Sequence, residues 1–137
     1  MITKSDMMLP LVEACPTFEP TWQAFLDEWT HDEAGLDGGY LPLYLALGDL
    51  ADHLIDMLAR RETSAFPANF AVVTRWHVEG DGYVREAATV GLLECIQNTN
   101  LHTSTRPEHF RAFLGPDSET WWDKLYGFWK RGELLRE

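Results

Sequence analysis

Three carboxylates and an imidazole recur on one face of the helix predicted for residues 40–61. At 3.6 residues per turn, five polar side chains lie within about 100° of one another: Asp49, Asp52, His53, Asp56 and Arg60. Such a group could hold a hard divalent cation or shuttle protons. One helix cannot close a coordination sphere, and a helix also needs a solvated side with ion pairs such as Asp56–Arg60. We therefore expect a solvated face that can bind a partner, rather than a metal or catalytic site.

The helix predicted for residues 83–98 is apolar almost all round, apart from Glu86, Glu94 and Gln97. Glu86 and Glu94 are about two turns apart and so face roughly the same way. A carboxylate on a central helix is costly unless it is paired or hydrogen-bonded. One interpretation is an acid/base pair with raised pKa values. The favoured alternative is structural: Glu94 accepts hydrogen bonds from Arg75 or a helix end, or reaches solvent.

No familiar catalytic, metal or phosphate motif occurs elsewhere in the chain. The five histidines show neither H-x-x-x-H nor H-E-x-x-H spacing, and His77 is expected to be satisfied by nearby groups. There is no G-x-S-x-G, and the glycines at 35, 38 and 39 lie among acids that would repel phosphate. Cys15 and Cys95 sit in apolar patterns typical of free buried thiols. We predict no catalytic residue, no metal and no cofactor.

The last predicted helix carries a cluster of aromatic residues that divides between two faces. Trp121, Leu125 and Phe128 form one face, and the other consists of Trp122, Tyr126 and Trp129. A terminal helix cannot bury both faces fully, so one should pack on the core. We expect the second face, Trp122, Tyr126 and Trp129, to be available as an exposed docking patch.

The net charge of −11 originates almost wholly in the first half of the chain. Residues 1–58 hold eleven acids and one base, whereas residues 59–137 hold eleven acids and ten bases. Phosphate-backbone binding needs the opposite sign, so nucleic acid is not expected as a ligand. A basic protein would be attracted by the negative electrostatic potential of this half. The residues predicted to bind it are three acids of the loop at 30–39 and four residues of the following helix: Asp32, Glu33, Asp37, Asp49, Asp52, His53 and Asp56.

Apolar residues recur at steps of three and four along most of the chain, and proline and glycine separate these stretches. The pattern predicts helices over 5–15, 18–29, 40–61, 66–79, 83–98, 108–114 and 117–131. No segment longer than four residues alternates cleanly, so strands are not expected. Short connections predict antiparallel hairpins. The expected fold is all-α, with six or seven helices in stacked hairpins, as a short HEAT-like solenoid or an irregular bundle.

The chain of 137 residues, 45% hydrophobic, fits one globular domain spanning residues 1–137. No apolar run approaches the ~20 residues that span a bilayer, and the start has no basic segment followed by an apolar one. We therefore expect a cytoplasmic protein without a membrane partner.

Two stretches carry a family likeness. They are Val90-Gly91-Leu92-Leu93-Glu94-Cys95-Ile96-Gln97-Asn98 and Leu114-Gly115-Pro116-Asp117-Ser118-Glu119-Thr120-Trp121-Trp122. Together they resemble an uncharacterised bacterial all-helical family known as a domain of unknown function. The resemblance implies no catalytic residues. Small acidic helical proteins are often immunity partners in toxin systems, and that analogy implies a basic partner.

Three hypotheses for function follow. The leading one is a non-enzymatic protein-binding domain whose acidic N-terminal half meets a basic protein, as an immunity-type partner would. The first alternative is a helical enzyme that uses the carboxylates of helices 40–61 and 83–98, with His53 or His77 converging on them. The second is a homo-oligomer joined through the tryptophan-rich C-terminal helix.

Overall fold

The computed structural model of the chain describes residues 1–29 and 41–131, with side chains up to residue 128. Within these ranges the fold is all-α, as predicted, and holds seven α-helices. They are α1 (Met8–Ala14), α2 (Glu19–Trp29), α3 (Leu43–Ala59), α4 (Phe66–Glu79), α5 (Gly82–Glu86), α6 (Glu94–Gln97) and α7 (Pro116–Arg131). The described residues form no β-strand, and one isolated bridge pairs Ile2 with Gly80. The predicted loop at 30–39 lies outside the described residues.

Four shorter segments complete the described chain. Three are 3₁₀-helices: η1 (Pro16–Phe18), η5 (Thr99–Leu101) and η6 (Pro107–Phe113). The short helix predicted for residues 108–114 is therefore present, as a 3₁₀-helix over Pro107–Phe113. The fourth, η4 (Ala87–Leu93), is π-helical and joins α5 to α6 in one continuous helix.

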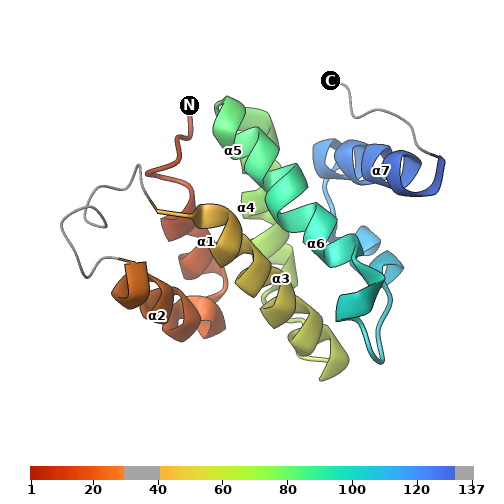
Figure 1. The fold of residues 1–137 in the computed structure, drawn as a ribbon, viewed down its shortest axis with the longest axis horizontal. Helices are drawn as coiled ribbons and strands as arrows, with labels where there is room; N and C mark the ends of the chain where they lie inside the picture. Colours follow the sequence, from red (N-terminus) through yellow and green to blue (C-terminus); the bar gives the residue numbers. More distant parts are fainter. Residues whose placement is uncertain (30–40, 132–137) are drawn as a thin grey trace.

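The helices pack as an irregular bundle rather than a solenoid. Figure 1 shows α3 running down the front, α4 returning behind it, and the continuous helix α5–η4–α6 running beside α3 in the same direction. Helix α4 also contacts α1 and α7, which lie far from each other in the sequence. A solenoid would restrict contacts to neighbouring repeats. The contacts therefore favour the second of the two predicted packings.

Large buried side chains explain why α4 is central. Trp76 is fully buried, and its indole N–H donates to the carbonyl of Met7 at 3.1 Å, which fastens α1 to α4. Phe66 stacks on Phe110 with ring centroids 5.6 Å apart, which brings η6 onto the other end of α4. Each such side chain contributes about 1.5–3 kcal/mol when fully buried. These contacts tie α1 and η6, which lie far apart in the sequence, to one helix.

The first residues are held at the junction between α4 and α5. The backbone N–H of Ile2 donates to the carbonyl of Glu79 at 2.8 Å, and that of Asp81 donates to the carbonyl of Ile2 at 2.9 Å. The carboxylate of Asp81 accepts from the backbone N–H of Val84 at 2.9 Å, so it caps α5. The short connection between α4 and α5 is therefore a capped turn that also anchors the N-terminal segment.

The π-helical stretch allows close packing between η4 and α3. The backbone N–H of Glu94 donates to the carbonyl of Thr89, five residues earlier, as in a π-helix. Within this stretch, Gly91 lies so close to α3 that a Cβ there would meet Cδ1 of Leu47 at 2.8 Å. Only glycine permits this separation without displacing Leu47, which is fully buried. The sequence indicated one regular helix here, and that expectation is wrong for residues 87–93.

Replacing two helical glycines by alanine should change stability in opposite directions. Gly91→Ala should lower the free energy of unfolding by about 1–3 kcal/mol, because the buried Leu47 has no free space to enter. Gly48→Ala on α3 should raise it by up to about 1 kcal/mol, because a Cβ there meets nothing within 4 Å and alanine favours helix. Urea denaturation of both variants measures the two values. Equal effects would contradict the close packing.

Candidate functional site

The acidic face of α3 consists of Asp49, Asp52 and Asp56, all of them exposed. Asp56 pairs with Arg60 at 2.8 Å, as the i,i+4 spacing predicted. Partial burial raises the pKa of Asp52, and the charge of Asp49 raises it further. The two carboxylates therefore repel each other, and a cation that bound here would relieve that repulsion.

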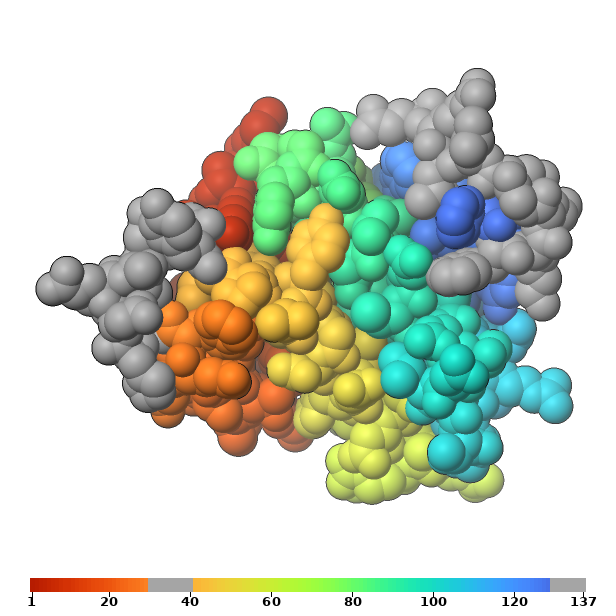
Figure 2. Space-filling view, in the orientation of Figure 1, coloured from red at the N-terminus to blue at the C-terminus, as the bar shows by residue number. Residues whose placement is uncertain are grey.

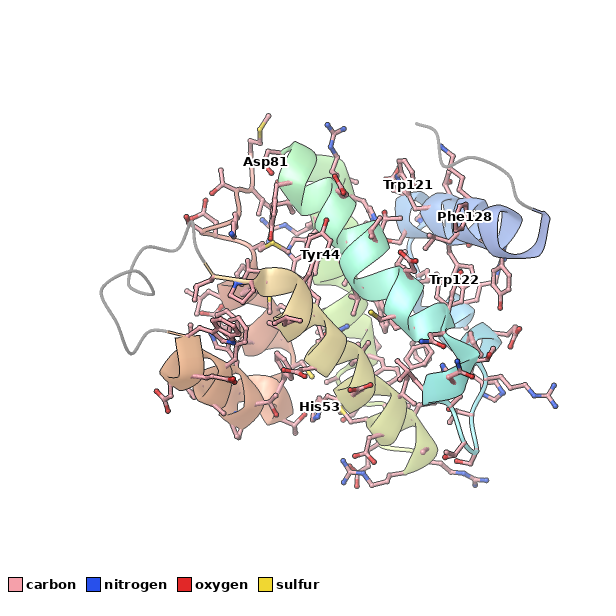
Figure 3. All side chains as sticks on the ribbon, in the orientation of Figure 1. Tyr44, His53, Asp81, Trp121, Trp122 and Phe128 are labelled. Atoms are coloured by element: carbon pink, nitrogen blue, oxygen red, sulfur yellow. The ribbon has the colours of Figure 1, made fainter. Side chains whose placement is uncertain are left out.

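His53 does not share this face, although the spacing placed it there. Its Nε2 lies 2.8 Å from the hydroxyl of Thr17, and its ring lies 5.7 Å from that of Phe18. Figure 3 shows the side chain on the side of α3 that faces α2. Burial lowers the pKa of His53, while Asp56 raises it and Arg60 lowers it. His53 therefore joins α3 to the segment before α2, and the single polar stripe that we predicted is divided in two.

The other acids predicted to bind a partner, Asp32, Glu33 and Asp37, lie outside the described residues.

A groove of about 900 Å³ lies between the C-terminal part of the continuous helix and α7. Figure 2 shows α3 and α6 exposed next to each other on the face in view. None of the described residues that line the groove is basic. They come from η4, α6, η5, η6 and α7, and they are Val90, Glu94, Cys95, Gln97, Asn98, Thr99, Asn100, Glu108 and Tyr126.

Glu94 presents its carboxylate to this groove. It is half-buried, and burial raises its pKa. Arg75, which we considered as its partner, instead binds Glu79 at 3.0 Å, and Glu94 has no hydrogen bond or ion pair with any residue that the structure describes. The desolvation of this charge is therefore not offset by a nearby cation in the described part of the chain.

Cys95 connects the groove to the acidic face of α3. Burial raises the pKa of its thiol, and the charges of Glu94 and Asp52 raise it further. Asp52 lies on α3 and Glu94 on α6, and these two helices pack against each other. A raised pKa keeps the thiol protonated, so this environment does not activate Cys95 as a nucleophile.

Gln97 forms part of the groove wall, and only the nitrogen of its side-chain amide is hydrogen-bonded within the described residues. Its Nε2 donates to the carbonyl of Trp122 at 2.9 Å, which links α6 to α7. The side chain is only 7% exposed, and its Oε1 accepts no hydrogen bond among the described residues. A buried acceptor without a donor is costly. Gln97 therefore places a buried acceptor, without a donor among the described residues, in the groove wall that also carries Glu94.

Across the groove, Tyr126 and Glu108 form a hydrogen-bonded pair. The hydroxyl of Tyr126 donates to Oε1 of Glu108 at 2.8 Å. Burial raises the pKa of Tyr126 to about 12, helped by this hydrogen bond and by the charge of Glu108. The pair holds the ring of Tyr126 in place on the α7 side, so the groove is lined by a carboxylate on α6, that of Glu94, and by another on η6, that of Glu108.

The residues required for the proposed enzyme do not converge. Glu86 is exposed beside Tyr44 of α3, and it raises the pKa of that phenol, which reaches about 12 mainly through burial. Glu94 lies in the groove, and His53 faces Thr17. The two glutamates therefore do not form the acid/base pair that we considered.

His77 lies in the core, away from the groove. Its Nδ1 is 2.7 Å from the hydroxyl of Ser118 on α7, and its Nε2 is 2.9 Å from that of Thr89 in η4. Burial lowers the pKa of His77 to about 4, partly offset by Asp117. The expected satisfied histidine is confirmed, although its partners are remote in the sequence.

Comparison with protein-family models matches residues 8–130 to the family described as a domain of unknown function, DUF7674. The chain belongs to this family. The resemblance carried by the stretches 90–98 and 114–122 is therefore confirmed. Comparisons with curated proteins and with solved structures gave no match.

Two further findings concern the DUF7674 chain as far as it is described. None of its helices is both long and apolar enough to cross a membrane. Nowhere among the same residues do three or more His, Cys, Asp or Glu side chains gather as metal ligands.

The docking patch predicted on α7 of this DUF7674 domain is wrong for Trp122. Trp122 is fully buried with Leu125, because α7 packs that face against α4 and η4. Tyr126 is half-buried beside Glu108, and the side chain of Trp129 lies outside the described residues. Phe128 is 40% exposed, and Trp121 lies with the amine of Lys124 4.3 Å from its ring centroid. Figure 3 shows Trp121 and Trp122 on different sides of α7.

Proposed function

We propose that this DUF7674 domain is a non-enzymatic protein-binding domain that recognises a basic protein. The recognition surface comprises the acidic face of α3 and the adjoining groove. One observation carries the proposal: α3, with Asp52, and α6, with Glu94, pack against each other and are exposed side by side on one face (Figure 2), so the two acidic regions adjoin. A basic partner would then meet a field that extends over two helices.

The pairing of charges supports a functional role for this surface. In the second half of the chain, Arg75 binds Glu79, and Arg111 binds both Glu119 and Asp123. Those carboxylates are already neutralised within the domain. By contrast, no described cation pairs with Asp49, Asp52 or Glu94. Unpaired charges of one sign steer oppositely charged partners most effectively.

Reversing two acids on α3 should slow association with the partner. The variant Asp49→Lys/Asp52→Lys should reduce the association rate about tenfold or more at low salt, and the difference should shrink as salt shortens the Debye length. The matched control, Glu79→Lys/Glu119→Lys, makes the same change in net charge but replaces carboxylates that already pair with arginines. It should have the smaller effect.

The experiment begins with immobilised wild-type domain and both variants in lysate from the source cell. A basic protein retained by the wild type and the control, but not by the α3 variant, is then purified for stopped-flow kinetics. If acidity serves solubility alone, the two variants will behave alike and no basic protein will be retained specifically. That result would end the proposal.

A further inference from the structure

We propose that the groove between α6 and α7 is a pocket for the guanidinium group of one arginine side chain of the basic partner. This inference rests on the proposed function and adds a specific contact to it. Among the described residues, two hydrogen-bond acceptors of the groove, on Glu94 and Gln97, have no donor, and the described lining has no positive charge.

Two acceptors on α6 form the polar wall of the pocket. Glu94 and Gln97 are three residues apart, so their side chains lie on one face of the helix. The carboxylate of Glu94 is unpaired among the described residues, and Oε1 of Gln97 is buried without a donor. The hydrogen bond from Nε2 of Gln97 to Trp122 fixes the amide orientation, so Oε1 stays the free end.

A guanidinium group suits these acceptors better than an ammonium group. It is planar, carries five N–H donors in a fixed fork and is weakly hydrated, so it can bind a carboxylate and an amide oxygen together. Val90 and the ring of Tyr126 also line the groove and can cover the aliphatic stem of an arginine. The chemistry of the walls therefore selects arginine over lysine.

Three arginines of the chain itself are engaged elsewhere. Arg60 binds Asp56 and Glu62, Arg75 binds Glu79, and Arg111 binds Glu119 and Asp123. Arg75, which the sequence analysis considered as a donor to Glu94, is one of them. No described basic residue lines the groove, so charge complementarity fits a cation supplied by the partner.

The test uses two synthetic peptides of equal length and charge, in which glycine alternates with four arginines or with four lysines. Calorimetric titration should show the arginine peptide binding about fivefold or more tightly to the wild-type domain. Glu94→Gln should weaken that peptide about tenfold, the effect of losing a charge-assisted hydrogen bond, and should remove the preference. The pKa of Glu94, followed by NMR, should fall when the arginine peptide saturates the wild type.

The control is Glu86→Gln, which removes one charge from the same continuous helix outside the groove. It should affect both peptides equally and weakly. Gln97→Met should also weaken the binding of the arginine peptide. Because this variant loses the hydrogen bond to Trp122, its melting temperature is measured as a check on folding. Equal binding of the two peptides, with Glu94→Gln behaving like Glu86→Gln, would overturn the pocket. If the pocket were overturned in this way but the α3 variant Asp49→Lys/Asp52→Lys bound neither peptide, the proposed recognition of a basic protein would still stand. If the wild type bound neither peptide, both proposals would be contradicted.

Discussion

Leu92→Ala and Leu93→Ala should each lower the free energy of unfolding by about 2–5 kcal/mol. Both side chains are fully buried in η4, and this segment contacts α3, α4 and α7. Removing three heavy atoms there loses the transfer free energy and leaves a cavity, because packed helices on several sides cannot all move inward. Chemical denaturation at neutral pH measures the loss.

The matched control for these variants is Leu45→Ala. Leu45 is 55% exposed on α3, so the same atoms are removed from a site in contact with water. The change should be within about 0.5 kcal/mol. Losses below about 1 kcal/mol for both Leu92 and Leu93 would show that the continuous helix is peripheral, against the packing described above.

The domain should lose about 3 kcal/mol of stability as the pH falls from about 6.5 to about 4. In the folded state, burial lowers the pKa of His77 from 6.5 to about 4. Between these two values the unfolded chain binds a proton at His77 that the folded chain does not. Acidification therefore favours unfolding, and the difference between the two pKa values corresponds to about 3 kcal/mol.

Denaturation curves recorded between pH 7 and pH 4 test this expectation in wild type and in His77→Gln. Glutamine does not titrate but can still bond to Ser118 or Thr89, so the variant should show a smaller fall in stability. His53→Gln is the comparison: burial also lowers the pKa of His53, but its imidazole is less enclosed. If His77→Gln kept the full wild-type loss, another group would be responsible.

Much of the secondary structure could be predicted because proline and glycine mark its ends. Helix α4 runs from Phe66 to Glu79 as predicted, with Pro67 in its first turn and Gly80 after its last residue. The pattern could not reveal the π-helical stretch, because its residues are apolar on all sides and fit a regular helix equally well. It also could not tell which aromatic face of α7 is buried, since both faces have helical spacing.

The candidate site was only partly predictable. The sequence drew attention to Glu94 and Gln97 because they interrupt an apolar helix. It gave no sign that Glu108 and Tyr126 stand opposite them, since these residues meet only through the packing of η6 and α7. The polar run Asn98-Thr99-Asn100 after the helix was a signal that could have been used. For His53 the helical spacing was misleading. It placed the imidazole on the acidic face of α3, and it could not reveal the hydrogen bond between this imidazole and Thr17.

The π-helical geometry of η4 has a consequence for the groove that follows it. A π-turn holds more residues than an α-turn, so every side chain after it is rotated about the helix axis relative to an uninterrupted α-helix. Glu94 and Gln97 come directly after η4 and therefore owe their direction to it. A domain with the same polar residues but a regular helix over 87–93 would turn them elsewhere. The chemistry of the groove is thus set by the backbone of a segment that contributes only Val90 to its lining.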